Sequence, residues 1–421
     1  MEIKYFCESQ KHIKTIHIDE RSNTMLRSSL GFHTLNISFP LMEDNTLQLI
    51  RDFKKYDTAT QNLKMYYQNS MNDPLKIYHP KDNSTFLPKY IKIYYKDYNG
   101  IKWSIRYTGE FQGFFPYRIY ATINPKMMGG LHDYLTAATY DDMSTVIDNF
   151  NLAAKRISPV LENFSSYKID RVDYCINFDL RDFMEKCNPE LIMNLIKRGN
   201  IPAFFKEYTK YNETAHRTQS MPGSFYLINN SVHINCYSKY MQLQELSRQK
   251  IQYGELPIPQ TTLDAAYNII RFEVQYKWFK LYSLSRKMKS VTGHEFRKYE
   301  DLLSHSSCRE AVTQYFNKTI IAGDWWTLKE AVGIITSKNY NCQKKARLIK
   351  VLKMVNHFRS VEKAKENCQD SELRIFHQTL NDLSEININP VTIPKEYGIK
   401  HIPNLLCAYF EQTQKEKGVF S

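Results

Sequence analysis

The fold is decided by three stretches of the sequence: KIDRVDYCINF at 168–178, SFYLINNSVHINCYSK at 224–239 and IRFEVQY at 270–276. Each alternates apolar and polar side chains with a period of two, which is typical of a β-strand with one polar face. Asn229 and Asn230 favour a tight turn, so the second stretch is expected to form a hairpin. Asp, Glu, His, Tyr and Lys side chains would then gather on one face of a sheet.

The sequence around these stretches predicts further strands first and helices later. Alternating runs predict strands at 32–39, 89–95, 102–107 and 117–123, with a hairpin signal at Asn99-Gly100. Helical spacing appears at 141–163 and dominates from residue 281 onward. We therefore predict an α+β protein with an antiparallel-sheet body. Its expected parts are a strand-rich N-terminal part (1–140), the sheet region that carries the three stretches (141–280) and a mostly helical C-terminal domain (281–421).

Composition favours a nucleic-acid partner. The 421 residues carry a net charge of +13 and include 30 Tyr and 23 Phe. Excess Lys and Arg suit phosphate contacts, and aromatic rings offer stacking surfaces for unpaired bases. An AT-rich genome would enrich Tyr, Lys and Asn in any protein, so this indication needs support from specific residues.

Other features of the sequence bear on location. No apolar run approaches the ~18 residues that a membrane helix needs, so no membrane partner is expected. The N-terminal residues lack the apolar region of a signal peptide, which predicts a cytoplasmic protein. The eight cysteines are scattered without a Cys-x-x-Cys pair, so neither a zinc ribbon nor a disulfide framework is expected.

Tyr226 is the candidate nucleophile. It lies on the strand that enters the predicted hairpin, opposite a returning strand that carries His233, Tyr237 and Lys239. Phenol has a pKa of about 10, so a tyrosine that attacks phosphorus needs a nearby base or cation. Lys239 or a metal ion could supply that charge. The alternative is that Tyr226 simply packs in the sheet.

Asp170, Asp173 and Glu273 are candidate metal ligands. Hard ions such as Mg²⁺ or Mn²⁺ prefer carboxylate oxygens, and phosphodiester cleavage uses them to polarise the phosphate. The alternative is a structural ion pair with Arg171 or Arg271, which are also candidates for DNA contacts. His233 resembles half of a His-hydrophobe-His metal pair, although a single strand histidine is more often structural.

Together the three stretches resemble the rolling-circle replication initiators of bacterial plasmids and filamentous phages, which include the transposon- and plasmid-type initiators and the phage gene II protein group. The resemblance covers about residues 165–280. It rests on the order and spacing of four elements: Arg171-Val-Asp173, Tyr226-Leu227, Ser231 through Tyr237-Ser-Lys239, and Arg271-Phe-Glu273. It implies a degenerate His-hydrophobe-His (HUH) or Rep-like nuclease fold.

The resemblance also implies an activity. Such an enzyme nicks one strand of an origin, keeps the 5′ end as a phosphotyrosine and leaves a 3′ hydroxyl. Carried over, Tyr226 would be the nucleophile, Asp173 and Glu273 would bind Mg²⁺ or Mn²⁺, and Lys239 would stabilise the phosphate or phenolate. The DNA would be single-stranded or melted origin as well as duplex origin. A host helicase and a homodimer are partners that such an initiator could take.

The sequence departs from the family pattern at the hairpin. Asn229 and Asn230 replace the usual Gly and Arg after the Tyr-hydrophobe pair, and the usual acidic residue between Tyr237 and Lys239 is missing. These changes leave Tyr237 as a second candidate nucleophile.

Two other classes of function stay open. His294-Glu-Phe-Arg297 fits the His-x-x-Arg pattern of tyrosine recombinases, with Tyr299 or Tyr315 downstream, although four-residue patterns of this kind arise readily by chance. A recombinase would join its tyrosine to a 3′ phosphate. The third reading is a DNA-binding replication or regulatory factor without catalysis, in which the acidic groups are structural.

The helical C-terminal part carries a cluster of basic residues on one predicted helix. A duplex-DNA contact and a solvated helix face are about equally consistent with it. The candidate residues for DNA binding are Lys344, Lys345, Lys350 and Lys353.

Overall fold

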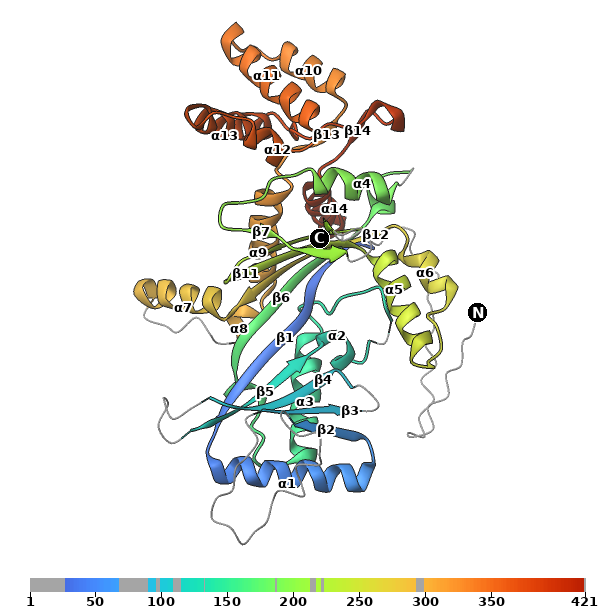
Figure 1. Cartoon of the computed structure of the whole chain (residues 1–421), viewed down its shortest axis with the longest axis vertical. Helices are drawn as coiled ribbons and strands as arrows, with labels where there is room; N and C mark the ends of the chain where they lie inside the picture. The colour runs from blue at the N-terminus through green and yellow to red at the C-terminus, as the bar shows by residue number, and fades with distance from the viewer. Residues whose placement is uncertain are drawn as a thin grey trace.

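A computed structural model describes most of the chain. The residues that it describes are 27–67, 90–95, 99–108, 115–131, 133–185, 188–212, 217–220, 223–292 and 299–419. They form an α+β protein built on one large antiparallel sheet, as the sequence predicts (Figure 1).

The sheet has ten strands in the order β2-β3-β4-β5-β1-β6-β12-β11-β10-β7. Neighbouring strands pair antiparallel throughout. Strand β1 lies at the centre and joins the N-terminal strands to those of the three diagnostic stretches. The bounds are β1 (Ser29–Leu41), β2 (Leu63–Tyr67), β3 (Tyr90–Tyr95), β4 (Ile101–Tyr107), β5 (Tyr117–Ile123), β6 (Lys168–Asp179), β7 (Lys206–Glu207), β10 (Ser224–Ile228), β11 (Val232–Ser238) and β12 (Ile269–Lys277).

One face of the central strands is apolar and is covered by α9 (His305–Thr319). Phe178 of β6 and Phe272 of β12 both pack edge-on against Phe316 of this helix, at ring-centroid distances of 5.7 and 5.3 Å. Tyr174 of β6 and Tyr276 of β12 contact each other edge-on at 5.3 Å, further along the same two strands. Alternation along each strand therefore sends the apolar side chains toward α9 and leaves the polar ones on the other face.

The N-terminal half of the sheet is covered by α1 (Glu43–Thr60) and α3 (Met143–Ile157). Trp103 of β4 is 1 % exposed and lies between Phe53 of α1 and Phe150 of α3. Two short helices, α2 (Pro125–Met128) and α4 (Pro189–Lys197), each begin with an asparagine cap followed by proline. The helix expected at 141–163 corresponds to α3, which is shorter, and the Pro at the start of the 188–197 segment correctly predicts the start of α4. Helix α1 was not among the expected elements.

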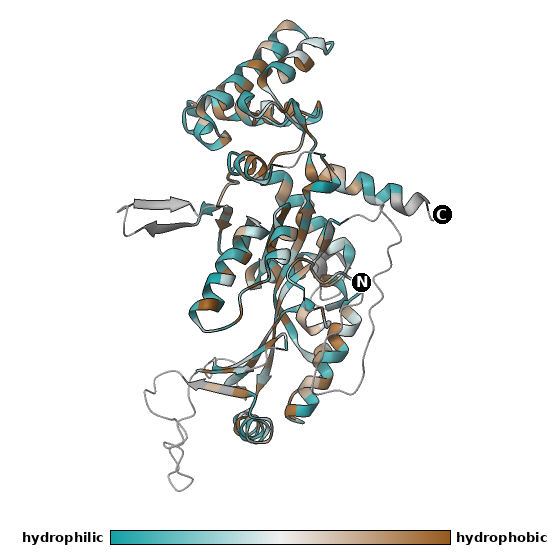
Figure 2. Ribbon diagram, turned by 90° about the vertical axis from the view of Figure 1, so that its right-hand side faces the viewer, coloured by the Kyte–Doolittle hydropathy of each residue, from teal (hydrophilic) through white to brown (hydrophobic). Residues whose placement is uncertain are grey.

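Most of the C-terminal helices form a group beside the sheet. Residues of α10 (Leu328–Ser337), α11 (Cys342–Phe358) and α13 (Asp370–Glu385) share a small hydrophobic core of their own, with α12 (Val361–Glu366) alongside. Figure 2 shows this group at the top, with hydrophobic and hydrophilic turns alternating along its helices. The last helix, α14 (Leu405–Val419), returns to the main core through Leu405 and Tyr409.

The remaining elements are short or lie at the edges. The region 209–222 reads as a polar loop in sequence, whereas its described residues form a separate hairpin of β8 (Thr209–Asn212) and β9 (Arg217–Ser220). Helices α5 (Lys239–Gln252), α6 (Gln260–Ala266), α7 (Trp278–Thr292) and α8 (Tyr299–Leu302) flank the sheet, and β13 (Trp325–Trp326) pairs with β14 (His401–Ile402). Among the described residues, no helix combines the length and apolar character needed to cross a membrane.

Gly31 holds a loop close to β1. A Cβ atom at this position would lie 2.2 Å from the backbone oxygen of Ala138, which accepts a hydrogen bond from the Phe32 amide. Gly31→Ala should therefore displace the loop and destabilise the protein by roughly 1–3 kcal/mol. The matched control is Gly333→Ala within α10, where a Cβ meets no atom within 4 Å; it should be neutral or stabilising by up to about 1 kcal/mol. Differential scanning calorimetry of both variants measures this, and equal melting temperatures would contradict the predicted contact.

Candidate active site

Register places the polar residues of four strands in rows across one face of the sheet. Directly opposed residues in neighbouring antiparallel strands have side chains about 5 Å apart. One row is Asp173, Gln275 and His233; the next is Cys175, Glu273, Asn235 and Tyr226; the third is Asn177, Arg271, Tyr237 and Ser224. Every catalytic or metal-binding candidate from the three stretches except Asp170 and Lys239 belongs to one of these rows.

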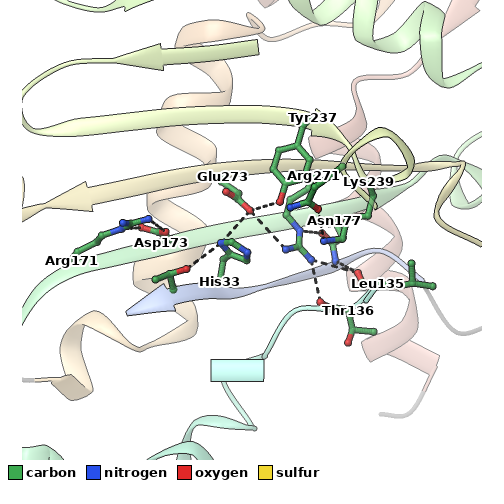
Figure 3. A network of polar contacts seen from close by, with 12 residues as sticks. His33, Leu135, Thr136, Arg171, Asp173, Asn177, Tyr237, Lys239, Arg271 and Glu273 are labelled. Atoms are coloured by element: carbon green, nitrogen blue, oxygen red, sulfur yellow. Dashed lines mark hydrogen bonds and ion pairs between the residues drawn. The ribbon is translucent and has the colours of Figure 1, made fainter. Parts of the chain in front are cut away.

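Glu273 lies at the centre of this face. Its carboxylate accepts a hydrogen bond of 2.7 Å from the Tyr237 hydroxyl, and the same oxygen lies 3.4 Å from Nδ1 of His33 and 3.7 Å from Nη1 of Arg271. Figure 3 shows Tyr237, His33 and Arg271 converging on it from three strands. Burial alone would raise the pKa of Glu273, but the neighbouring His33 imidazole, the Arg271 guanidinium and the Tyr237 hydroxyl outweigh it and lower the pKa. Glu273 is therefore held as a carboxylate.

Arg271 is fixed by several partners. It is 2 % exposed, and its Nε donates to Oδ1 of Asn177 at 2.6 Å. Its Nη2 donates to the backbone oxygen of Thr136 at 3.1 Å, and Asn177 donates to the backbone oxygen of Leu135 at 2.9 Å. The guanidinium thus anchors the loop at 135–136 to the sheet, and this burial keeps it from reaching solvent.

Arg171 and Asp173 form a two-pronged ion pair at the edge of the same face. Nε and Nη2 of Arg171 donate to the two carboxylate oxygens at 2.8 and 2.5 Å. Burial raises the pKa of Asp173, and the Arg171 charge opposes that rise. The Asp173 side chain is 3 % exposed whereas that of Arg171 is 34 % exposed, so the guanidinium is the partner with room to move.

His33 is a site residue that sequence reasoning missed. The pairing of β1 with β6 shifts register between Phe32 and Thr34, which makes His33 the extra residue of a β-bulge. Bulges re-aim side chains, and this one brings the imidazole to Glu273. The His33 side chain is 34 % exposed, yet the surrounding protein desolvates the ring enough to lower its pKa, and the nearby Arg271 charge adds to that shift. The strand was predicted, and the only sign of the bulge in its alternation is the pair of successive polar residues His33 and Thr34 between Phe32 and Leu35.

Lys239 lies at the start of α5, next to Tyr237 and away from Tyr226. Its Nζ donates to Oε1 of Gln242 at 2.8 Å and lies 6.0 Å from the centre of the Tyr237 ring. The residue is 6 % exposed, and burial together with the Arg271 charge holds the pKa of its amine well below the usual range. The structure therefore associates Lys239 with the second candidate tyrosine.

Tyr226 and His233 form a pair on the hairpin. The Tyr226 hydroxyl lies 3.0 Å from Nδ1 of His233, and Nε2 of the same ring lies 3.4 Å from Nζ of Lys277. Burial and then the Lys277 and Arg171 charges lower the pKa of His233 to about 4, so the imidazole is neutral at neutral pH. Burial raises the pKa of Tyr226, and the Arg171 charge acts in the opposite direction.

The two candidate tyrosines differ in access. Tyr237 is 7 % exposed, donates its hydroxyl proton to Glu273, and has its pKa raised well above the usual range by burial and by that carboxylate. Tyr226 is half-buried, with the Tyr208 ring edge-on at 5.5 Å. A DNA phosphate can approach Tyr226 more easily than Tyr237 because its hydroxyl is not enclosed by the carboxylate network.

The metal-ligand candidates are only partly brought together. Within the described ranges, no group of three or more His, Cys, Asp or Glu side chains is arranged to hold a metal ion. Asp173 and Glu273 share one face, but both oxygens of Asp173 are engaged by Arg171. Asp170 lies near Tyr120 of β5, whose pKa its charge raises after the larger effects of burial and Arg118. His233 is bonded to Tyr226 instead.

The basic residues of α11 are divided between internal contacts and solvent. Lys344 pairs with Asp382 at 3.8 Å, Lys350 pairs with Glu372 at 3.3 Å, and Lys345 donates to the backbone oxygen of Thr336 at 2.7 Å. Lys353 is exposed, and the Lys350 side chain is 72 % exposed despite its partner. Lys350 and Lys353 are the members of this set best placed to meet a duplex.

The recombinase pattern cannot be assembled from the described residues. His294 and Arg297 lie outside them. Tyr315 is 6 % exposed and packs against Tyr276 and Phe205 under the apolar face of the sheet. That tyrosine lies on the opposite face from Glu273.

Comparison with known proteins adds little to this geometry. No protein-family model matches the chain, and no curated protein matches it. Among solved structures, the chain is similar to a rolling circle replication initiator protein from Geobacillus stearothermophilus, at 10 % sequence identity and a TM-score of 0.26, over 63 % of this chain and 80 % of the other. A similarity of this size assigns neither a family nor an activity.

The contact between His233 and Lys277 predicts how the stability of the protein depends on pH. His233 should titrate near pH 4, against an ordinary value of 6.5. Since the folded-state pKa is lowered, the stability that this residue contributes is fully present above pH 6.5 and is lost as the pH falls from there toward 4. Lys277→Met removes a positive charge and should raise the His233 pKa, whereas Lys280→Met should change it less.

Histidine-selective isotope labelling and an NMR titration measure these values directly. Assignment of the His233 signal comes from its loss in His233→Gln. A wild-type His233 that titrates near 6.5, or one that does not respond to Lys277→Met, would show that the ring does not sit in the described environment.

Proposed function

We propose that this chain is a rolling-circle replication initiator that nicks one DNA strand through Tyr226. The observation that carries the proposal is the position of its hydroxyl. It belongs to a half-buried side chain, is bonded to the neutral imidazole of His233, and lies on the same face as the Glu273, Asp173 and Arg171 side chains. The sequence resemblance over residues 165–280 and the net charge of +13 support a DNA substrate.

The reaction proposed is a transesterification. The Tyr226 oxygen bonds to the phosphorus of one phosphodiester, and the bond from that phosphorus to the 3′ oxygen of the preceding nucleotide breaks. The phenol loses its proton and the departing 3′ oxygen gains one, which leaves a 5′-phosphotyrosyl end and a free 3′ hydroxyl. His233 orients the phenol through its Nδ1 contact.

Arg171 is the proposed source of positive charge near the phenol. Its charge lowers the pKa of Tyr226 against the effect of burial, so it favours the phenolate that attacks. A guanidinium also fits a phosphate with two parallel hydrogen bonds. Arg271 is too buried for that role, and we propose that it positions Glu273 and the loop at 135–136 instead.

Lys239 and Tyr237 form a second set in this proposal. Tyr237 holds Glu273, and Lys239 lies beside the Tyr237 ring. They would carry the chemistry only if the site opened enough to expose the Tyr237 hydroxyl. Lys350 and Lys353 of α11 are proposed to contact duplex origin DNA. A host helicase and a homodimer stay predictions of the sequence.

The donor groups of this site are of the chemical types that bind a divalent ion. His33, Asp173 and Glu273 offer one imidazole and two carboxylates on adjacent strands, which suit Mn²⁺ or Mg²⁺ once Arg171 turns away from Asp173. Bound there, such an ion would polarise the phosphate and neutralise developing charge. His233 and Asp170, the other candidate ligands, lie beside Tyr226 and Tyr120 and are not part of this set.

The nucleophile proposal predicts the behaviour of two variants. Tyr226→Phe should abolish the covalent adduct with a single-stranded origin oligonucleotide, because it removes only the attacking oxygen, and should leave binding nearly unchanged. Tyr237→Phe should retain adduct formation at reduced rate, since it loosens Glu273 without removing the nucleophile. Denaturing gels of protein incubated with labelled oligonucleotide and Mn²⁺ report both. An adduct that survives Tyr226→Phe and disappears in Tyr237→Phe would reverse the assignment.

The metal proposal predicts opposite effects from neighbouring substitutions. Asp173→Asn and Glu273→Gln should weaken Mn²⁺ binding, because each removes a hard anionic ligand. Arg171→Gln should strengthen it, because the guanidinium no longer competes for Asp173. Asp170→Asn is the matched control and should have no effect.

Electron paramagnetic resonance titration of Mn²⁺ measures binding without reference to cleavage. Unchanged titrations in Asp173→Asn and Glu273→Gln would remove the proposed metal site. Adduct formation that persists in excess chelator would show that no metal is needed.

A further inference from the structure

Helix α7 begins next to a lysine that contacts His233, the residue bonded to the candidate nucleophile Tyr226. It follows β12 without a loop, and the last residue of that strand, Lys277, places its Nζ 3.4 Å from Nε2 of His233. The Lys277 amide also donates to the backbone oxygen of Ser231 in the hairpin turn at 3.0 Å. The first residue of α7, Trp278, therefore directly follows the lysine that contacts His233. Figure 1 shows α7 extending outward from the body at this point.

An aromatic and cationic ladder runs along α7. The rings of Trp278 and Tyr282 stack with centroids 5.1 Å apart and planes within 7°, and the Arg286 guanidinium lies 5.9 Å from the Tyr282 ring centre. These three residues are spaced four apart, so they lie along one side of the helix. Phe279 adds an edge-on contact to Trp278 at 5.0 Å.

The aromatic rings of the ladder face solvent. Trp278, Phe279 and Tyr282 are 43, 58 and 43 % exposed. The same helix buries Leu281 and Ser285, at 0 and 7 % exposure, against the body. One side of α7 thus packs against the body, and the aromatic side lies toward solvent. A cluster of exposed large aromatic rings on a soluble protein marks a binding surface.

The charge around the ladder selects the kind of partner. The sequence of α7 contains no Asp or Glu, while Arg286 and Lys287 lie along it and Lys277 precedes it. Lys280 is not part of this border, because its ammonium lies over the Tyr276 and Tyr315 rings. Stacked rings bordered by Lys and Arg are the combination that binds unpaired bases and their phosphates, because every base offers a flat face and every phosphate a negative charge. An apolar protein partner would not require this excess of positive charge.

We propose that the Trp278–Tyr282–Arg286 ladder stacks bases of the single-stranded DNA that flanks the phosphodiester presented to Tyr226. The proposal rests on the proposed function only in taking Tyr226 as the nucleophile that receives the strand. Base stacking on the ladder does not itself require cleavage. It gives the strand a fixed path from α7 to the hairpin. Stacking is tolerant of sequence, so the ladder would hold the melted strand while other residues read the origin.

The test compares two probes that differ only in bases. One probe is a short labelled oligothymidine, and the other is the same strand with abasic residues at its centre. Fluorescence anisotropy measures the affinity of the full-length protein for each probe in the presence of a chelator. The double variant Trp278→Ala/Tyr282→Ala should lose affinity for the intact strand by about fivefold or more and should bind the abasic strand as the wild type does. The slope of log affinity against log salt should not change, because no phosphate contact is removed.

Two further variants separate stacking from general damage. Trp278→Phe/Tyr282→Phe keeps two flat rings and should restore most of the base preference. Tyr253→Ala removes a ring that is 81 % exposed at the end of α5, and it should have no effect. Circular dichroism melting confirms that each variant is folded.

The outcomes distinguish the ladder from its rivals. Equal losses on both probes, or no loss on either, would overturn the stacking proposal. Sedimentation of the protein alone would also overturn it if the double variant lost self-association that the wild type shows, since the ladder would then be an interface between copies. If the protein forms the covalent adduct but binds both probes equally, the stacking proposal alone is wrong. If it prefers the intact strand but forms no adduct, the nicking proposal alone is wrong.

Discussion

The site depends on one buried carboxylate, that of Glu273. Removing an ionised carboxylate from water costs several kcal/mol unless charges and hydrogen bonds replace the lost solvation. Here the replacement comes from the Tyr237 hydroxyl, the Arg271 guanidinium and the His33 imidazole, which reach it from β11, β12 and β1. Any change that weakens one of these partners leaves a charge uncompensated inside the protein, so the three strands must keep their register.

That requirement extends beyond the sheet. Arg271 can serve Glu273 only while its other donors are held by Asn177 and the Thr136 backbone. The loop at 135–138 is in turn held against β1 by the close approach at Gly31. A chain of contacts thus runs from the glycine of an N-terminal strand to the carboxylate. It leaves the second carboxylate, Asp173, with the more exposed Arg171, so the partners of Glu273 are more firmly enclosed than the partner of Asp173.

Alternation in sequence was enough to predict the strands and their polar face. It correctly placed Asp173, Glu273, Tyr237 and Tyr226 on that face, because side-chain direction in a strand follows from position alone. It could not provide the position of β1 between β5 and β6, since strand order depends on the whole sheet. The bulge at His33 leaves a trace in the two successive polar residues His33 and Thr34, but the sequence does not show that it aims the imidazole at Glu273. The sequence also does not show which arginine pairs with which carboxylate. Arg171 and Arg271 were both plausible partners for Asp173 and Glu273, and only the side-chain geometry assigns them. The ladder on α7 could have been suspected from the spacing of Trp278, Tyr282 and Arg286, but its exposure could not.

The central claim is that the Tyr226 oxygen becomes joined to a 5′ phosphate. The most direct measurement is tandem mass spectrometry of the adduct formed with a single-stranded origin oligonucleotide, after digestion with trypsin and a nuclease. Trypsin should release residues 218–239 as one peptide, which contains both candidate tyrosines. We expect the residual nucleotide on Tyr226, linked through its 5′ phosphate, with a free 3′ hydroxyl on the other DNA fragment. A nucleotide on Tyr237, or a tyrosine joined through a 3′ phosphate, would contradict the proposed reaction.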